Sequence, residues 1–399
     1  MQEGEQEMYD FDRITDRRGT DSLKHDFAVE YGLPADVLPL WVADMDFPVA
    51  REITEALTER VNHGIYGYSD VKADYAEIVA DWYDRHFSWR PEADWLVKTP
   101  GVVVALAMAV RAFTEPGDAV LIQPPVYRPF FGVVRNNGRK VVENTLVLKD
   151  GHYEIDFEDF EQKIRTEKVH LFILCSPHNP VGRVWTEQEL LRIGEICGKY
   201  DVMIVSDEIH CDLVRPGYIH SPLLKALPGL KDQCVQCTAP SKTFNLAGLQ
   251  VSNIWIPDPK KRKMFTREMD AAGLSLLNSL GLVAARAAFQ HGDQWLKECL
   301  EYLEGNYRLI REETEEHLPG VRLIEAEGTY FAWLDFSGLG ISDETLNDRL
   351  IHRGKLWLDA GTIFGKEAGN CFQRLAYVSP RSVIKDAMER MRKSLYEAE

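Results

Sequence analysis

The sequence contains no long apolar run and no excess of positive charge. Its 63 acidic residues outnumber the 46 basic ones, which gives a formal net charge of −17. That charge disfavours nucleic acid and anionic membrane surfaces as partners, and the lack of a long apolar run disfavours a membrane span. The start, MQEGEQEMYD, lacks the apolar core of a signal peptide and is typical of a short acidic arm. These absences favour a soluble cytoplasmic protein that binds a small molecule.

Cysteine is sparse, and its spacing favours buried packing over a zinc or redox site. Of the seven cysteines, Cys234 and Cys237 form a C-x-x-C, but no second pair and no nearby histidine completes a metal site. Most of the others lie among apolar residues, where a free thiol packs as a small hydrophobe. We therefore predict buried free thiols, a reducing cytoplasm and no metal.

The chain is long enough for two domains. With 399 residues and 45% hydrophobic composition, it can bury a substantial core. From about residue 96, short apolar runs alternate with amphipathic stretches, a pattern typical of an α/β fold in which helical crossovers join parallel strands. The predicted strands occupy residues 119–122, 140–144, 169–174, 202–206, 234–237 and 250–256.

Two helices in this region carry clear signals. Residues 186–200 include Thr186 and Glu189 at the spacing of a capping box, and their apolar residues share one face. The stretch TPGVVVALAMAVRAF is apolar nearly all round, which predicts a buried helix that ends at the EPGD segment.

Beyond about residue 285 the helices become longer and more charged, which predicts a second, smaller α+β domain. We expect a strand within residues 328–336 and a last helix capped by Ser379 with Pro380 at its first position. The first forty or so residues show little periodicity. We expect them to lie over the C-terminal domain or over a neighbouring subunit.

Polar side chains follow three of the predicted strands. Asn179, Asp207 and Lys242 each come shortly after a different strand. Ligands of an open parallel sheet bind outside the carboxyl ends of the strands, so these side chains should meet. Taken alone, each has an ordinary explanation: a turn residue before proline, a helix cap and a solvated surface charge. Taken together, these explanations are less favoured, because an acid directly after a buried strand needs a cation to offset its desolvation.

An amine, a carboxylate and an amide are the groups that a pyridoxal phosphate ring needs. The amine bonds to the aldehyde carbon, the carboxylate keeps the pyridine nitrogen protonated, and the amide donates to the phenolic oxygen. Free backbone N–H groups at the start of the helix after Gly101 can hold the phosphate. Tyr127 follows another strand and can cover the ring, or it can belong to the core or to an interface.

Several motifs resemble one enzyme family. A resemblance to the fold-type-I pyridoxal-phosphate enzymes of the class I/II aminotransferase superfamily rests on SPHNPVGRVW, SDEIHCDLV and APSKTFNLAGL, in that order and spacing. A narrower resemblance to its cystathionine β-lyase branch, the cysteine-S-conjugate or C–S lyases, rests on RRGTDSLKHD, LPLWVADMDFP, IYGYSD and EGTYFAWLDF. The resemblance covers about residues 10 to 395.

The resemblance implies a large domain with a mostly parallel seven-stranded sheet flanked by helices, and a smaller α+β domain. It places an N-terminal arm and part of the small domain at residues 1–48. The large cofactor-binding domain then covers residues 49–287, and the small C-terminal domain covers residues 288–399. It also implies a homodimer.

The resemblance further implies roles for the polar residues. Lys242 would form the Schiff base with the cofactor, Asp207 would hold the pyridine nitrogen, and Asn179 would donate to the ring oxygen. Tyr127 would stack on the ring, and Lys242, Tyr127 and Asp207 would be the catalytic residues. His210 either supports the ring or is a core histidine bonded to backbone. The cofactor phosphate would contact residues of both subunits, namely Gly101, Val102, Val103, Ser241 and, from the second subunit, Tyr68.

Arg374 matches the arginine that clamps the α-carboxylate of the substrate with two parallel hydrogen bonds. The alternative is a surface ion pair, which the apolar neighbours Phe372 and Leu375 disfavour. The chain departs from the superfamily pattern at Ala376, where Arg-x-Asn is common. The sequence therefore leaves open which groups support Arg374.

The implied reaction is a β-elimination. L-cystathionine or a related S-substituted L-cysteine would yield pyruvate, ammonia and a thiol, which is homocysteine in the case of cystathionine. An aminotransferase uses the same cofactor residues, and only the branch motifs, WVADMDF above all, favour the lyase. A non-catalytic regulator on this fold would be expected to lose Lys242 or Arg374, and both are present. No motif identifies the side-chain pocket, so the preferred sulfur substrate is not predicted.

Overall fold

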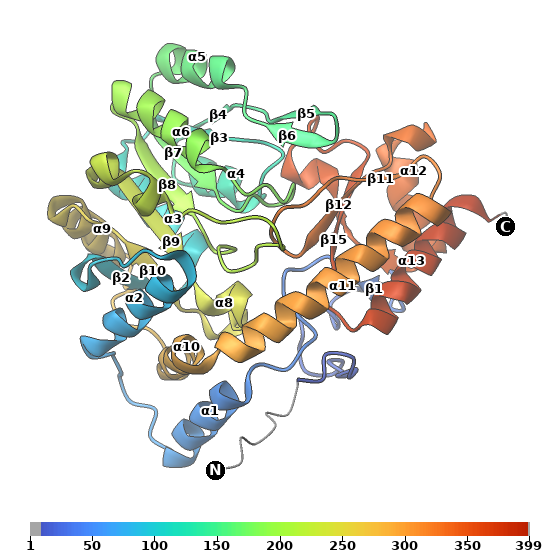
Figure 1. Cartoon of the computed structure of the whole chain (residues 1–399), viewed down its shortest axis with the longest axis horizontal. Helices are drawn as coiled ribbons and strands as arrows, with labels where there is room; N and C mark the ends of the chain where they lie inside the picture. Colours follow the sequence, from blue (N-terminus) through green and yellow to red (C-terminus); the bar gives the residue numbers. More distant parts are fainter. Residues whose placement is uncertain (1–8, 398–399) are drawn as a thin grey trace.

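The computed structural model describes residues 9–397, and the first eight residues of the predicted acidic arm lie outside the described residues. Its largest element is a seven-stranded sheet in the order β2-β10-β9-β8-β7-β3-β4 (Figure 1). The strands are β2 (Leu96–Thr99), β3 (Ala119–Ile122), β4 (Lys140–Glu143), β7 (Val169–Cys175), β8 (Met203–Asp207), β9 (Cys234–Thr238) and β10 (Ser252–Trp255). The seven-stranded sheet that the resemblance implies is thus present.

The strand directions bring most carboxyl ends to one edge. β4, β3, β7, β8 and β9 pair in parallel with one another, in that order. β10 is antiparallel to both β9 and β2. The predicted run at 250–256 is therefore a strand, but it is not parallel. The segment between β9 and β10 holds only the short helix α8 (Pro240–Thr243) and a 3-10 turn, and no helical crossover returns the chain to the other end of the sheet.

Alternate side chains of the strands pack on opposite faces of this sheet. Leu171 and Ile173 of β7 belong to one buried cluster, which includes α3 (Val102–Phe113), α4 (Pro129–Asn136) and α9 (Pro259–Ala271). Phe172 and Leu174 belong to the other, which includes α5 (Phe157–Glu167) and α6 (Glu187–Lys199). Because both faces are covered, the strands are near-continuous apolar runs in the sequence.

The helix ends follow some of the sequence signals. The capping box of α6 is confirmed, since Thr186 accepts from the Glu189 N–H and the Glu189 side chain reaches back to the cap. The predicted cap at Ser379 is wrong. Helix α13 (Arg381–Tyr396) has Pro380 at its N-cap position, and the Ser379 hydroxyl donates instead to a buried carboxylate, Asp46, at 2.6 Å.

A second, antiparallel sheet has the order β11-β12-β15-β14. Its strands are β11 (Arg322–Leu323), β12 (Phe331–Asp335), β14 (Asp359–Ala360) and β15 (Phe372–Ala376), and β12 confirms the strand predicted within residues 328–336. Helices α11 (Asp293–His317) and α13 pack side by side, and α12 (Asp343–Asp348) lies in the same part of the molecule (Figure 1). The predicted domain boundary at residue 287 falls inside α10 (Ser279–His291) and stays a prediction.

The N-terminal segment lies against this second part of the chain, which is the first of the two predicted positions. β1 (Leu38–Pro39) pairs in parallel with β13 (Leu356–Trp357), and the Ala376 N–H donates to the carbonyl of Leu40. The segment then leads to α1 (Arg51–His63), which packs on α10. The remaining elements are α2 (Asp74–Phe87), α7 (Leu223–Ala226) and the hairpin of β5 (Val147–Lys149) and β6 (His152–Glu154).

The cysteines pack as predicted. All seven are buried free thiols. Cys234 and Cys237 join different core clusters, because residues three apart on a strand point to opposite faces. Among residues 9–397, no helix has both the length and the apolar character needed to cross a bilayer.

Candidate active site

Nine of the predicted site residues line one cavity of about 290 Å³. The cavity lies where β7, β8 and β9 end and where α3 begins. The nine are Gly101, Val102, Val103, Tyr127, Asn179, Asp207, His210, Ser241 and Lys242. The parallel sheet thus brings together residues that are far apart in the sequence.

Lys242 lies on α8, the helical turn after β9. Its Nζ donates to the backbone carbonyl of Ala43 at 2.7 Å. Burial lowers the pKa of Lys242 to about 8, although the charge of Asp44 acts in the opposite direction. Near neutral pH, part of the amine is therefore unprotonated and nucleophilic. The interpretation as a solvated surface charge does not apply.

Asp207 is the last residue of β8 and its residue surface is 4% exposed. One carboxylate oxygen accepts from the Ile209 N–H at 3.1 Å, which is the local contact expected of a capping aspartate. Burial raises the pKa of Asp207 to about 7, the charge of Glu208 adds to the rise, and Lys242 opposes it. A carboxylate with so little solvation gains strongly from a cation placed in the cavity.

Two aromatic side chains that line the cavity, Tyr127 and His210, are uncharged. Tyr127 comes shortly before α4, and its ring meets Phe130 edge to face. Burial raises the pKa of Tyr127 to about 12, so the hydroxyl stays protonated. His210 packs edge to face on Tyr330 and Phe331, and burial lowers its pKa well below the usual value. The His210 ring is therefore neutral at physiological pH.

Asn179 connects the cavity to Arg374. Nη1 of Arg374 donates to the Oδ1 of Asn179 at 2.8 Å. Because the amide oxygen is used in this way, the NH₂ group of Asn179 is left to donate towards the cavity that Asn179 lines. Arg374 is not among the residues that line this cavity, but it is in direct contact with Asn179, which does line it.

Arg374 is on β15 and only 4% exposed, so the interpretation as a surface ion pair is wrong. Its Nη2 donates to the carbonyl of Trp41 at 2.9 Å and forms an ion pair with Asp359 of β14. These two groups, together with Asn179, supply the support that Ala376 cannot provide. The sequence did not single out Trp41 or Asp359.

The start of α3 offers backbone donors to an anion. No side chain caps this helix, so the N–H groups of Val102 and Val103 remain available. A Cβ placed on Gly101 would meet no atom within 4 Å, so it would project into the open cavity. Ser241 lines the same cavity next to Lys242. This end of the cavity therefore fits a phosphate group.

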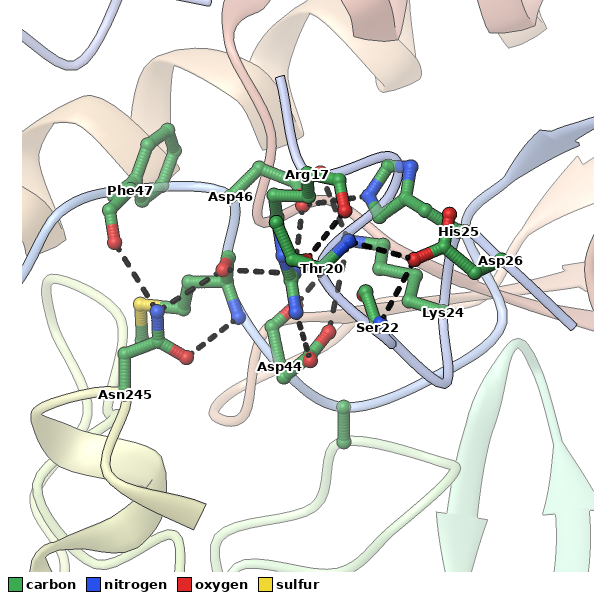
Figure 2. Close-up of polar contacts among 12 residues, drawn as sticks. Arg17, Thr20, Ser22, Lys24, His25, Asp26, Asp44, Asp46, Phe47 and Asn245 are labelled. Atoms are coloured by element: carbon green, nitrogen blue, oxygen red, sulfur yellow. Dashed lines mark hydrogen bonds and ion pairs between the residues drawn. The ribbon is translucent and has the colours of Figure 1, made fainter. Parts of the chain in front are cut away.

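Sequence reasoning missed the segment 43–47, which supports Lys242. Asn245, three residues after Lys242, accepts from the Met45 N–H at 2.9 Å and donates to the carbonyls of Met45 and Phe47 (Figure 2). The only signal in the sequence was the WVADMDF motif, which identified the family branch without revealing this role.

Two acidic residues of the same segment, Asp44 and Asp46, form ion pairs with residues 17–25 of the N-terminal arm (Figure 2). Arg17 forms ion pairs with Asp44 at 2.7 Å and with Asp46 at 2.9 Å. Lys24 has a fully buried side chain and pairs with Asp46 at 2.8 Å. Burial alone would raise the pKa of Asp46, but the charge of Lys24 and the hydrogen bonds from His25, Lys24 and Ser379 hold it well below the usual value. The arm therefore fastens the segment that carries the acceptor for Lys242.

Tyr68 is the predicted site residue that is most exposed in the single chain. Its residue surface is 98% exposed, and its neighbours Ile65 and Tyr66 are 65% and 57% exposed. Its predicted contact with the cofactor phosphate is a contact between subunits and stays a prediction. Across residues 9–397, no group of three or more His, Cys, Asp or Glu side chains is placed to hold a metal ion.

Comparison with other sequences agrees with this arrangement. The aminotransferase class I and II family matches residues 35–391. The chain is 44% identical over 385 residues to the cystathionine beta-lyase PatB of Bacillus subtilis (strain 168). That alignment covers 96% of this chain and 99% of the Bacillus protein.

Comparison with solved structures extends the similarity to the whole arrangement. Cystalysin from Treponema denticola, which contains a pyridoxal 5'-phosphate cofactor, superimposes with a TM-score of 0.94 at 38% identity, over 98% of this chain and 99% of that one. The PLP-bound C-S lyase from Staphylococcus hominis superimposes with a TM-score of 0.92 at 33% identity, over 98% and 99% of the two chains.

Proposed function

Because the chain belongs to the aminotransferase class I and II family, we propose that it is a pyridoxal-phosphate-dependent carbon–sulfur lyase. Its substrates are L-cystathionine or related S-substituted L-cysteines, and its products are pyruvate, ammonia and a thiol. One observation carries the proposal: the Lys242 amine and the Asp207 carboxyl line one cavity, in a chain 44% identical to a cystathionine beta-lyase over nearly its full length.

The described residues fit the cofactor. The free N–H groups at the start of α3 and Ser241, which line the same cavity, are assigned to the phosphate. Asp207 is assigned to the pyridine nitrogen, Tyr127 to one face of the ring, and the NH₂ group of Asn179 to the phenolic oxygen. His210, which lines the same cavity, is assigned to the support of the ring. When bound, the cofactor supplies an electron-withdrawing ring that takes up negative charge from the substrate Cα.

Arg374 is assigned to the α-carboxylate of the substrate. A guanidinium can grip a carboxylate with two parallel hydrogen bonds, which fixes the orientation of the amino acid as well as its position. Asn179 accepts from Arg374 and lines the cavity, so it couples the position of the clamp to the position of the reacting group.

Lys242 is assigned to the proton transfer. Its lowered pKa of about 8 leaves enough neutral amine to accept the proton from Cα. The electron pair of that C–H bond forms the Cα=Cβ double bond, and the pair of the Cβ–S bond leaves on sulfur. The sulfur then takes a proton to become the thiol. The enamine that is released reacts with water to give pyruvate and ammonia.

An aminotransferase is the second candidate, because the family that matches the chain is named for that activity. It would use the same residues up to the removal of the Cα proton. It would then need a keto acid to complete each cycle, whereas the elimination needs none. The requirement for a keto acid therefore separates the two functions.

We also propose a homodimer in which Tyr68 contacts the phosphate bound by the partner. The support is the exposure of Tyr68, Tyr66 and Ile65, which is unusual for a group of large apolar side chains. We place the enzyme in the cytoplasm, because seven unpaired thiols suit a reducing compartment.

The test is the formation of pyruvate from L-cystathionine by the purified holoenzyme with no keto acid added. A lactate dehydrogenase assay should record many turnovers of pyruvate per subunit, and a separate glutamate dehydrogenase assay should record an equal amount of ammonia. A single turnover, or activity that appears only when a keto acid is added, would assign the chain to the aminotransferases.

A further inference from the structure

The guanidinium of Arg374, which is assigned to the α-carboxylate of the substrate, already forms an ion pair with Asp359. We propose that Asp359 is a resident carboxylate that the α-carboxylate of the substrate must displace from Arg374, so that Asp359 sets the affinity of the site for amino acids. The inference rests on the proposed role of Arg374 as the carboxylate clamp.

The hydrogen bonds of Arg374 show why it cannot grip a substrate carboxylate with two hydrogen bonds while it keeps all of its present partners. A guanidinium has five N–H donors, and it can grip a carboxylate end-on through Nη1 and Nη2 or side-on through Nε and Nη2. Each grip needs a proton of Nη2. Both Nη2 protons are directed at partners already, because Nη2 donates to the Trp41 carbonyl and to Asp359. A two-pronged grip on a substrate therefore requires one partner to leave.

Asp359 is the partner that can leave. Trp41 contributes a backbone carbonyl, which cannot turn away without moving the chain, whereas the Asp359 carboxylate can rotate. The rings of Phe331 and Phe364 pack on the guanidinium, with centroids 4.1 and 4.8 Å from its central carbon. The N–H groups of a guanidinium point outward in its own plane, so a carboxylate must approach Arg374 along the edge of that plane.

The remaining donor indicates where the substrate binds. Nε of Arg374 is buried and has no hydrogen-bond partner among the described residues. A buried unpaired donor is unfavourable, so a carboxylate that accepts from Nε binds more tightly. The side-on grip through Nε and Nη2 satisfies this donor when Asp359 gives up Nη2.

The fold keeps Asp359 close after it is released. Asp359 and Arg374 are direct cross-strand partners on β14 and β15, and the Asp359 side chain is 13% exposed. Burial raises the pKa of Asp359, while the charges of Arg374 and then Arg128 oppose the rise. Arg128, an exposed residue at the start of α4, is therefore the second cation available to the displaced carboxylate.

The experiment measures the binding of glycine, which has an α-carboxylate and no leaving group. Asp359→Asn keeps the shape and a hydrogen-bond acceptor but removes the competing charge. We expect the dissociation constant of glycine for the holoenzyme, read from the absorption of the cofactor, to fall about tenfold. Glycinamide, which lacks the carboxylate, should bind equally to both proteins. The KM of L-cystathionine should fall more than kcat changes.

Asp335→Asn is the matched control, because Asp335 is a buried acid of the same sheet whose ion-pair partner is Arg322. It should leave glycine binding unchanged. Unchanged or weaker glycine binding by Asp359→Asn would overturn the inference and would mean that Asp359 only orients Arg374. Asp359→Ser is a second variant with the same expectation, should the asparagine protein fail to fold.

Arg128→Gln tests whether Arg128 receives the displaced carboxylate of Asp359. It should weaken glycine binding several-fold in the wild type and have no effect when combined with Asp359→Asn, as a double-mutant cycle would record. An equal effect in both backgrounds would mean that Arg128 does not receive Asp359. These constants are measured without turnover. A wild type that binds glycine but forms no pyruvate would therefore contradict the proposed reaction and leave the inference about Asp359 to be judged on binding alone.

Discussion

Lys242 and Ala43 are 199 residues apart in the chain, yet the lysine ammonium donates to the alanine carbonyl at 2.7 Å. The same carbonyl accepts from the Tyr330 hydroxyl at 3.1 Å. The resting position of the proposed catalytic amine is therefore set by a segment outside the large sheet. That segment is held in turn by Asn245 on one side and by the N-terminal arm on the other.

Replacing Lys242 by alanine should lower pyruvate formation by roughly a thousandfold or more, because among the described residues no other lysine lines the cavity to take the Cα proton. The matched control is Lys225→Ala. Lys225 also lies on a short helix, α7, and also donates to a backbone carbonyl, that of Phe87. The control protein should keep the wild-type rate. A Lys242→Ala protein with wild-type turnover would remove the proposed mechanism.

The stability of the cofactor-free protein should depend on pH through Asp207. Its pKa is about 7 in the folded protein and 3.8 without burial, so its neutral form favours folding below pH 3.8. That contribution is lost progressively as the pH rises from about 3.8 through about 7, because the unfolded state ionises first. The total change is on the order of 4 kcal/mol. Urea unfolding at a series of pH values should show the wild type losing this stability relative to Asp207→Asn. Parallel curves for the two proteins would contradict the shifted pKa.

The two adjacent arginines of the N-terminal arm should differ in their contribution to stability. Arg17→Ala leaves Asp44 and Asp46 short of a partner in a partly buried network and should lower the free energy of unfolding by about 2 kcal/mol. It should also reduce turnover, because the network supports the segment that positions Lys242. Arg18 is exposed and pairs with exposed Asp16, so Arg18→Ala should leave both quantities unchanged. Equal effects of the two substitutions would count against the network.

Tyr68 should matter only in the assembled dimer. Tyr68→Phe removes the hydroxyl proposed to reach the partner's phosphate and should weaken cofactor binding about tenfold while sedimentation still shows a dimer. Tyr66→Phe is the control, because the Tyr66 hydroxyl donates within its own chain to the carbonyl of Val61. An active monomer, or a Tyr68→Phe protein with unchanged cofactor affinity, would refute this contact.

The sequence predicted the site better than it predicted the surroundings of the site. Asn179, Asp207 and Lys242 were found because each follows a buried strand, and a parallel sheet places such residues at one edge. The antiparallel direction of β10 and the true partner of Ser379 were missed, since neither depends on local periodicity. The direction of β10 depends on the short connection that follows β9, and the partner of Ser379, Asp46, is distant in the sequence. Asp359 was missed because nothing in its local sequence separates it from an ordinary surface acid.

The sequence by itself determined six of the seven strands of the large sheet and the polar residues at their ends, because apolar periodicity and turn chemistry are local properties of the chain. Only the tertiary structure decided which distant groups complete the site. Ala43 reaches Lys242, Arg17 reaches Asp44, and Asp359 holds Arg374 because separate segments fold onto one another. The hydrogen bonds of those contacts depend on distance and direction in space, which residue spacing does not encode.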